Sequence, residues 1–458
     1  MTLNLEIIRD GLNRLAKADL DDGTAPDLET AMARLRDYRI HVAAGPEVAD
    51  SAPHQAALLT VVNVVGRFAL GGVTVSGDLD VPLLVLGDRS ASLAAEVAAL
   101  GGRPGTANDG VPTVVVGSPP IDHGRAVAVT FEGWRGGIIP FGSTRLSERT
   151  SVVTSAVLGA ALAANEAFAM LRGEAEAGRR AVGLSLWRPD RAGDWWLPES
   201  DGPPLQALPN DLWILGLGHL GQAFLWHLLL CPFSDRSAVR LLLQDVDVVS
   251  ASTPSTSILT RTGMLGRPKT RAISEVLEMH GFRTTLVERP FDGRFRRRDV
   301  DDPAILVCGV DNVIARAEIE LPGFPFVVEA GLGDSAQDFR SIRIHTFPAT
   351  RKAVDLWHPS LQGAAPDLDR PAYRRLAASG GDVCGLTRLA QTAVGAPFVG
   401  TVAGALMLAQ ILRLLAGDVP DALVDLDLRA MRSRRAVSNT AVHPFNPGFQ
   451  PPEYTGLG

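Results

Sequence analysis

The chain has 458 residues, which is long enough for two or three domains, each with its own core. Its 46% hydrophobic and 21% charged residues are typical of a soluble globular protein, and the net charge of −7 argues against general nucleic-acid binding. The 3 cysteines are far apart and include no C-x-x-C pair. This excludes a zinc site built on thiolates and indicates a reducing, cytoplasmic location.

Residues 1–195 are predicted to form a first α/β domain without a nucleotide loop. The apolar stretches 58–75, 81–88 and 112–120 are typical of buried strands, and 91–100 is typical of a helix. No G-x-G-x-x-G pattern follows any of them. The helix expected over 154–173 resembles 396–417 in composition and order. The similarity indicates two related halves, the first degenerate, or a chance match between Ala-rich helices.

Residues 196–210 are rich in proline and are predicted to be a linker that Trp195 and Trp196 pack onto a domain. From 211 to 437, apolar strands alternate with helices. Strands are expected at 212–217, 239–245, 284–288, 304–309 and 325–330, and helices after Gly218, over 269–280 and over 312–321. This pattern predicts a doubly wound, Rossmann-like parallel sheet that binds its ligand at the carboxyl ends of the strands.

Two segments near the end of the chain need separate treatment. The uncharged stretch 389–412 is nearly long enough to span a bilayer, but its proline, glycines and glutamines favour a buried core helix over a membrane anchor. Residues 438–458 are rich in proline and glycine and are predicted to be a flexible tail with little structure of its own.

Three glycines, Gly216, Gly218 and Gly221, lie between an apolar strand and a helix. A loop without side chains lets backbone N–H groups and the helix N-terminus face a phosphate. Asp245 ends the next strand, where a carboxylate can accept hydrogen bonds from ribose hydroxyls, and Asp247 lies on the same side of an extended chain. These residues fit a dinucleotide as well as ATP. A turn acid that caps the next helix is the structural alternative for Asp245.

Two later residues favour ATP. Lys269 begins a helix and can neutralise an α-phosphate as negative charge develops on it. Asp311 directly follows an apolar strand and precedes Asn312, and a carboxylate there suits Mg²⁺ that also binds triphosphate oxygens. An NAD(P)-binding oxidoreductase would use the glycines and Asp245 but would leave Lys269 and Asp311 without a function. A catalytically inactive binding scaffold would not need the glycines, the two aspartates and the lysine together.

The patterns G-x-G-x-x-G, D-x-D-x-V, G-x-x-K and D-N-x-x-x-R follow one another between residues 211 and 417. In this order they resemble the ubiquitin-activating (E1) and ThiF/MoeB superfamily of adenylating enzymes. The resemblance implies that Lys269 contacts phosphate, that Asp311 binds magnesium, and that ATP is held by Gly216, Gly218, Gly221 and Asp245, with Asp247 beside them. Thr253 and Thr256 replace the Asn and Arg usual in the family, and Arg261 lies nearby as a candidate for the missing charge.

The additional first half is similar to the inactive adenylation domain of eukaryotic E1 enzymes. The whole chain is similar to the E1 of bacterial ubiquitin-like conjugation operons of the Bil antiphage type. This resemblance implies that the enzyme adenylates the C-terminal glycine of a ubiquitin-like protein, captures this protein as a thioester and passes it to an E2-like protein. Neither nucleic acid nor a membrane is expected as a partner. A sulfur-carrier or peptide adenylyltransferase is the alternative within the superfamily. Both a monomer and a homo-oligomer are consistent with the sequence.

Cys384 lies among glycines before the long uncharged stretch and is the candidate for the thioester, because we expect a mobile, accessible loop followed by a helix N-terminus. Cys231 and Cys308 are expected to be buried and inert. In paired adenylation domains the inactive half often lends an arginine to the active site. The candidates for this role are Arg34, Arg36 and Arg39.

Overall fold

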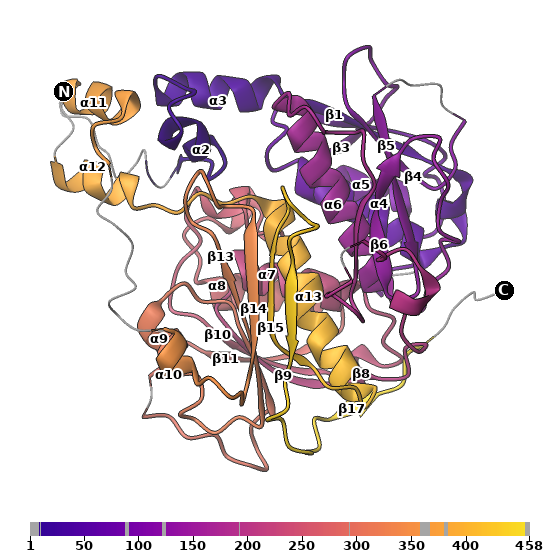
Figure 1. Ribbon diagram of the computed structural model, residues 1–458, viewed down its shortest axis with the longest axis vertical. Coiled ribbons are helices and arrows are strands. Elements are labelled where there is room, and N and C mark those ends of the chain that lie inside the picture. Colours follow the sequence, from indigo (N-terminus) through magenta and orange to yellow (C-terminus); the bar gives the residue numbers. More distant parts are fainter. Residues whose placement is uncertain are drawn as a thin grey trace.

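The structure, a computed structural model, describes residues 9, 11–87, 91–120, 125–191, 193–292, 294–357, 367–379 and 383–453, with the backbone alone at 383 and 384. Two mixed sheets lie on either side of a layer of helices (Figure 1). The first has the order β3-β2-β1-β4-β5-β6-β7 and the second the order β11-β10-β9-β12-β13-β14-β15-β16.

The strands of the first sheet are β1 (Arg39–Ala44), β2 (Gly72–Ser76), β3 (Gly102–Pro104), β4 (Thr113–Val116), β5 (Ala126–Glu132), β6 (Arg135–Pro140) and β7 (Val182–Ser185). Those of the second are β9 (Asp211–Leu215), β10 (Arg240–Gln244), β11 (Arg283–Val287), β12 (Ile305–Cys308), β13 (Phe326–Leu332), β14 (Ser341–Phe347), β15 (Asp421–Asp427) and β16 (Arg435–Ser438). A separate pair joins β8 (Leu208–Pro209) to β17 (Phe449–Gln450).

The helices are α2 (Ala16–Asp21), α3 (Leu28–Asp37), α4 (Ala52–Val65), α5 (Leu93–Ala99), α6 (Val153–Leu171), α7 (His219–Leu230), α8 (Lys269–Met279), α9 (Val313–Ala317), α10 (Ala353–Leu356), α11 (Pro371–Ala378), α12 (Val383–Ala390) and α13 (Pro397–Leu415). The strands and helices predicted in the second half are therefore present, although α9 is shorter than the predicted 312–321. The strand β11 is an edge strand and is mostly exposed.

The two sheets repeat one topology. In each, the first five strands in the spatial order are parallel. The pairing then becomes antiparallel, between β5 and β6 in one sheet and between β13 and β14 in the other. The helix α6 follows β6, and α13 follows the equivalent strand β14 after the inserted helices α10, α11 and α12, so the likeness of 154–173 and 396–417 reflects two related halves. The parallel sheet expected in the second half is present from β11 to β13, and it is extended by the antiparallel strands β14, β15 and β16.

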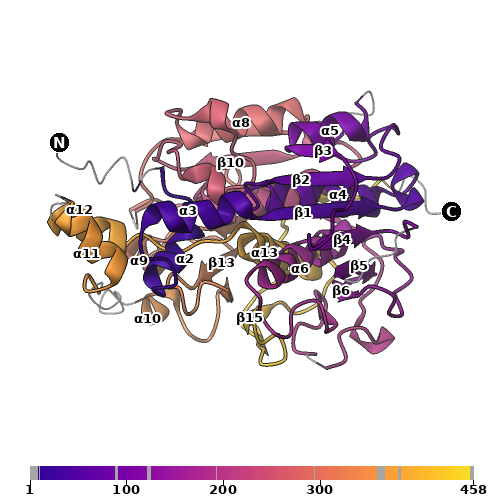
Figure 2. The same cartoon turned by 90° about the horizontal axis from the view of Figure 1, so that it is seen from above.

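The layer between the sheets consists of α4 and α6 from the first half and α7 and α13 from the second, and Figure 2 shows α6 and α13 side by side in it. These helices are buried on nearly all sides, which is why their sequences are apolar without a polar face. Both α6 and α13 are long and apolar enough to span a membrane by length and composition, and in this structure they are 100% and 89% buried inside the protein. The predicted core helix is confirmed in α13.

Two predictions for the first half were wrong. Most of 58–75 belongs to α4, and only its end forms β2, because a wholly buried helix and a buried strand share the same apolar composition. Residues 81–87 contribute only an isolated bridge between Pro82 and Ser92. The predicted strand within 112–120 and the helix within 91–100 are present as β4 and α5.

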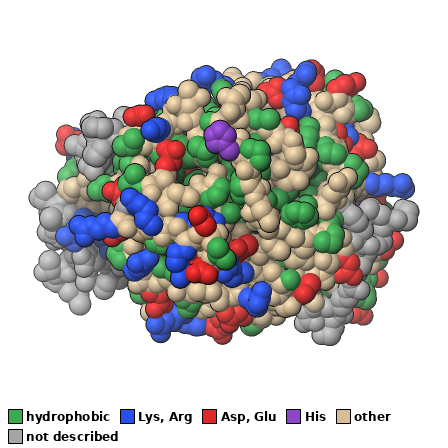
Figure 3. All heavy atoms as spheres, turned by 90° about the horizontal axis from the view of Figure 1, so that it is seen from below, with side chains coloured by type: hydrophobic (Ala, Val, Ile, Leu, Met, Phe, Trp, Pro, Cys, Tyr) green, Lys and Arg blue, Asp and Glu red, His purple; other side chains and the backbone are tan. Residues whose placement is uncertain are grey.

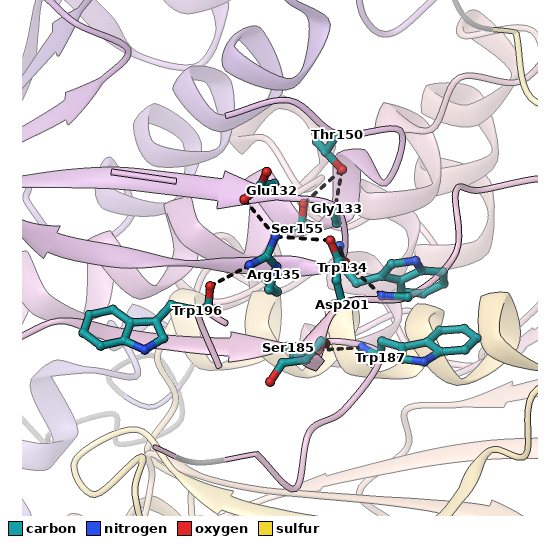
Figure 4. Close-up of polar contacts among 12 residues, drawn as sticks. Glu132, Gly133, Trp134, Arg135, Thr150, Ser155, Ser185, Trp187, Trp196 and Asp201 are labelled. Atoms are coloured by element: carbon teal, nitrogen blue, oxygen red, sulfur yellow. Dashed lines mark hydrogen bonds and ion pairs between the residues drawn. The ribbon is translucent and has the colours of Figure 1, made fainter. Parts of the chain in front are cut away.

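The segment predicted as a linker is fixed to the first half. Figure 4 shows Arg135 of β6 pointing between Glu132 and Asp201, with Nη2 2.8 Å and 3.3 Å from their carboxylates, while Nη1 donates to the carbonyl oxygen of Trp196 at 2.6 Å. Trp195 is buried against the strand glycines, since a Cβ at Gly183 would lie 2.4 Å from its ring. Trp195 thus packs this segment onto the domain as predicted.

Residues 449–450 lie beside the same segment. β17 pairs with β8, and Gln450 accepts hydrogen bonds from Ser234 and from the N–H of Asp235, each at 2.9 Å.

On the face seen from below, acidic and basic side chains are interleaved around hydrophobic ones (Figure 3).

Candidate nucleotide site

The candidate site lies at the carboxyl ends of three neighbouring strands. β9 is central, with β10 on one side and β12 on the other, and Leu215 is in register with both Gln244 and Cys308. The N–H of Gly216 donates to Gln244 (2.9 Å), and that of Gly309 donates to Leu215 (2.9 Å). The residues that follow these three strands therefore emerge at one level, where the connections diverge to opposite faces of the sheet.

The glycine turn allows no side chains at two of its positions. Gly216 has φ +87°, and a Cβ at Gly221 would lie 1.9 Å from the carbonyl oxygen of Gly216. Gly218 differs, because a Cβ there would meet only Lys269 Nζ, at 3.9 Å. Gly218 is the N-cap of α7 and provides no side-chain cap, so the first N–H groups of this 12-residue helix face the space beside Lys269.

The predicted acids and lysine meet at this turn. Asp245 Oδ2 accepts a hydrogen bond from the N–H of Leu217 (2.7 Å), and Oδ1 accepts one from the N–H of Asp247 (2.8 Å). Lys269 Nζ lies 2.7 Å from Asp247 Oδ2 and 3.9 Å from Asp245 Oδ2. The Asp245 side chain is 8% exposed and that of Asp247 is 65% exposed. Asp245 thus shapes the turn, while Asp247 and Lys269 form a pair at its solvent side.

Asp311 lies on the other side of the glycine turn. It follows Val310, whose side chain would be 2.8 Å from a Cβ at Gly216, and it is exposed. Asn312 caps α9, because its Oδ1 accepts hydrogen bonds from two backbone N–H groups, those of Ile314 and Ala315. Within the described residues no group of three or more His, Cys, Asp or Glu side chains is arranged around a common metal position, so Asp311 belongs to no such group.

Arg316, one turn beyond Asn312, is directed into the protein. Its guanidinium pairs with the buried Glu329 and stacks 3.3 Å from the ring centre of Trp357. Glu329 also contacts His345 Nδ1 at 2.9 Å. Arg316 therefore fixes α9, and with it the position of the residues after β12, to the interior of the sheet.

Two of the three candidate arginines of the first half have described side-chain contacts. Arg34 bonds to Asp19 and Thr24, Arg39 bonds to Asp37, and Arg36 is exposed, so the contacts described for Arg34 and Arg39 remain within the first half. Arg261 donates to the carbonyl oxygen of Ala99 at 2.9 Å, which directs its guanidinium towards α5.

Arg14 is a residue of the first half that no sequence motif includes. The N–H of Arg14 donates to Ser255 Oγ at 3.2 Å, and its carbonyl oxygen accepts from Gly395 at 3.4 Å. Burial, with a contribution from the charge of Arg14, lowers the pKa of His219, the first residue of α7, to about 4. Arg14 thus belongs to the first half but lies beside the start of the helix that follows the glycine turn. One arginine in an amphipathic N-terminal segment gives no signal that distinguishes it.

The cysteines separate into two groups. Cys231 and Cys308 are buried, and burial raises the pKa of each thiol to about 12, so both are inert thiols at neutral pH, as predicted. Cys384 was expected in a loop, but α12 begins at Val383, which places it in the first turn of a helix. Its side chain lies outside the described residues.

Comparison with known families identifies the chain. The family model for the BilD C-terminal domain matches residues 208–418, and that for the BilD N-terminal domain matches 39–186. The chain is 42% identical to the bacterial E1-like protein BilD of Collimonas sp. (strain OK412) over 421 residues, which are 91% of each chain. The chain belongs to the BilD family. This BilD-family chain is thus an E1-like protein, as its motifs predict.

Among solved structures the similarity is more distant. MccB of E. coli, in a crystal structure with ATP, is 13% identical and has a TM-score of 0.34, with 69% of this chain and 96% of MccB covered. PaaA is 16% identical with a TM-score of 0.34, and the similarity covers 50% of this chain and 64% of PaaA.

The first half of this BilD-family chain has a different side chain at the equivalent turn. Gly45 and Gly117 follow β1 and β4, as Gly216 and Gly309 follow β9 and β12. A Cβ on either Gly45 or Gly117 would lie 2.3 Å from the carboxylate of Glu47, and this carboxylate accepts the N–H of Ser118 at 2.9 Å. The carboxylate of Glu47 therefore fills the space between the two glycines.

Proposed function

We propose that this chain uses ATP to adenylate the C-terminal glycine of a ubiquitin-like protein, then holds the acyl group as a thioester on Cys384 and passes it to an E2-like protein. The observation that carries the proposal is the cluster of Lys269, Asp245 and Asp247 at the start of α7. Open space at Gly218, helix N–H groups and an ammonium group together form an anion site beside a carboxylate that can accept from a ribose.

In this proposal the residues of the chain act mainly by position and charge. The N-terminus of α7 and Lys269 receive the phosphates, and Lys269 exchanges the exposed Asp247 for a phosphate oxygen, which neutralises charge at the α-phosphate when the glycine carboxylate attacks it. The attack forms the acyl–phosphate bond and releases pyrophosphate. The Cys384 thiolate then displaces AMP. Asp311 would hold Mg²⁺, which would screen the triphosphate charge.

The alternatives are less consistent with this geometry. An NAD(P)-dependent oxidoreductase has no use for a lysine beside Gly218 or for an exposed carboxylate after β12. A sulfur-carrier or peptide adenylyltransferase would use the same cluster but would not need Cys384, so thioester formation separates it from the proposed activity.

The test is pyrophosphate exchange into ATP in the presence of a ubiquitin-like protein with an intact C-terminal glycine. Asp311→Ala should reduce the exchange by at least about a hundredfold, because the variant would lose the carboxylate that would hold Mg²⁺ against the triphosphate charge. Asp301→Ala removes an exposed carboxylate from the loop before β12 and serves as the matched control, with wild-type exchange expected. Exchange that survives Asp311→Ala, or tight NADH binding without ATP binding, contradicts the proposal.

A further inference from the structure

Arg67 connects the two halves at a point that the sequence motifs do not include. It lies in the turn after α4, and Asn63 Oδ1 accepts hydrogen bonds from its Nε (3.2 Å) and Nη2 (2.9 Å). Its guanidinium also donates to four carbonyl oxygens of one loop in the second half, those of Pro254 (2.6 Å), Ser257 (3.0 Å), Thr260 (3.2 Å) and Ile258 (2.5 Å).

The acceptors described around Arg67 are neutral oxygens, and all but Pro254 come from residues that are almost fully buried: Asn63, Ser257, Ile258 and Thr260 are 1–2% exposed. Burial lowers the pKa of Arg67 to about 9, and the charge of Arg261 contributes, so the guanidinium remains charged at neutral pH. An enclosed charge is costly unless dipoles compensate it. Four converging carbonyl dipoles need a planar donor with several N–H groups, which arginine has and lysine lacks.

The loop 254–260 is connected to the glycine turn through Gln222 of α7, which is fully buried. Gln222 Oε1 accepts a hydrogen bond from the N–H of Leu259 at 3.0 Å, and Gln222 Nε2 donates to the carbonyl oxygen of Leu217 at 2.8 Å. Thr260 Oγ1 also lies 2.9 Å from Nε2. Because Leu217 donates its N–H to Asp245, a continuous chain of hydrogen bonds runs from Arg67 to the carboxylate at the glycine turn.

We propose that Arg67 is a positioning residue through which the first half preorganises the nucleotide site of the second. It holds loop 254–260 in the arrangement that lets Gln222 fix Leu217, and so aims the glycine turn without touching the nucleotide. Thr256, which stands where the superfamily usually has arginine, lies in this loop, and Thr253 directly precedes it. The inference rests on the proposed binding of ATP at this turn.

The test compares Arg67→Lys with the wild-type full-length chain. Lysine keeps the charge but cannot bond to four carbonyls at once, so we expect the KM for ATP in pyrophosphate exchange to rise about tenfold, while kcat changes less than about threefold. Amide hydrogen exchange in the absence of nucleotide should become faster at Leu259 and Leu217. Arg180→Lys, which alters another contact between the halves, to the carbonyl oxygen of Arg429, is the control and should change none of these values.

Gln222→Met interrupts the same chain of hydrogen bonds and should also raise the KM for ATP. In the double variant the two effects should be strongly non-additive, because both act along one path. A folded Arg67→Lys chain with wild-type KM and wild-type exchange at Leu217, or additive effects, overturns the proposal. If Arg67→Lys does not fold, an unchanged KM in Gln222→Met overturns it. If the wild type does not bind ATP, the proposed function fails, and amide exchange at Leu217 still decides whether Arg67 controls the turn.

Discussion

Lys269 and its two carboxylate partners differ in how readily they can separate. Asp245 is 8% exposed and is fixed by two backbone N–H groups, so its position changes little when a ligand enters. Asp247 is 65% exposed, and an ion pair at such a site contributes only about 0–1 kcal/mol. A phosphate can therefore replace Asp247 at Lys269 at little cost.

The first prediction concerns the thiol. Cys384→Ala should support pyrophosphate exchange at the wild-type rate, because the residues proposed for adenylation are elsewhere, but it should form no reductant-sensitive thioester with the ubiquitin-like protein. The check is gel electrophoresis with and without reductant. Cys231→Ala is the matched control and should still form the thioester, since the Cys231 thiol is buried with a pKa of about 12. A normal thioester on Cys384→Ala would remove this residue from the mechanism.

At the scale of elements, α7 connects the candidate site to the central helix layer. His219 and His227 lie on this helix and pack against α13, where a Cβ at Gly400 would lie 2.2 Å from His219 Nε2 and where His227 Nε2 donates to the carbonyl oxygen of Thr401 at 2.8 Å. Burial lowers the pKa of both histidines to about 4. Both are therefore neutral at pH 7, and the contact between α7 and α13 depends on their remaining neutral.

This predicts how the free energy of unfolding changes with pH. The unfolded histidines have a pKa of 6.5, so between about pH 6.5 and 4 the unfolded state binds more protons than the folded state. The contribution of the two neutral histidines to the free energy of unfolding is complete above pH 6.5. It falls as the pH is lowered, by up to roughly 1.4 kcal/mol per pH unit for each histidine. Urea unfolding at pH 7 and pH 5 measures this slope. His227→Gln should reduce it, and a slope unchanged from wild type would show that His227 does not contribute. The exposed His443→Gln is the control.

At the scale of the molecule, the two halves pack against each other through the central helix layer. The helices α6 and α13 pack together, Trp226 of α7 donates to Thr60 of α4 at 2.9 Å, and Phe68 and Phe168 of the first half meet Phe398. The first half also holds the segment that leads to Cys384, since the hydroxyl of Tyr373 in α11 donates to Asp21 of α2 at 2.5 Å. The first half therefore contacts both the helices beside the candidate site and the segment that leads to Cys384.

A chain that begins at residue 200 should therefore lose pyrophosphate exchange. Without the first half, α7 and α13 would expose apolar surface, and Arg67 and Arg14 would be absent. Adding residues 1–195 as a separate chain should restore part of the activity and provides the control. Exchange at the full-length rate by the shortened chain would show that the first half is dispensable.

The sequence predicted the second half more completely than the first, for physical reasons. Its glycines, acids and lysine are placed by strand ends, and parallel strands bring their carboxyl ends to one edge, so Gly216, Asp245 and Lys269 could be grouped without a structure. In the first half α4 was mistaken for a strand, because full burial removes the polar face that distinguishes a helix. Arg67 and Arg14 act through main-chain oxygens and nitrogens far away in sequence, which no motif records.

Glu47 has a consequence for the evolution of the first half. Its carboxylate is ionised, since hydrogen bonds from the N–H groups of Ser118 and Glu47 itself outweigh burial and lower its pKa. A group tethered beside its own binding site acts at an effective concentration on the order of millimolar or more. Any free phosphate must compete with this internal anion. Glu47 stands two residues after Gly45, as Gly218 stands two residues after Gly216, so a return of nucleotide binding would require the loss of this carboxylate, because a competitor that travels with the chain cannot be diluted.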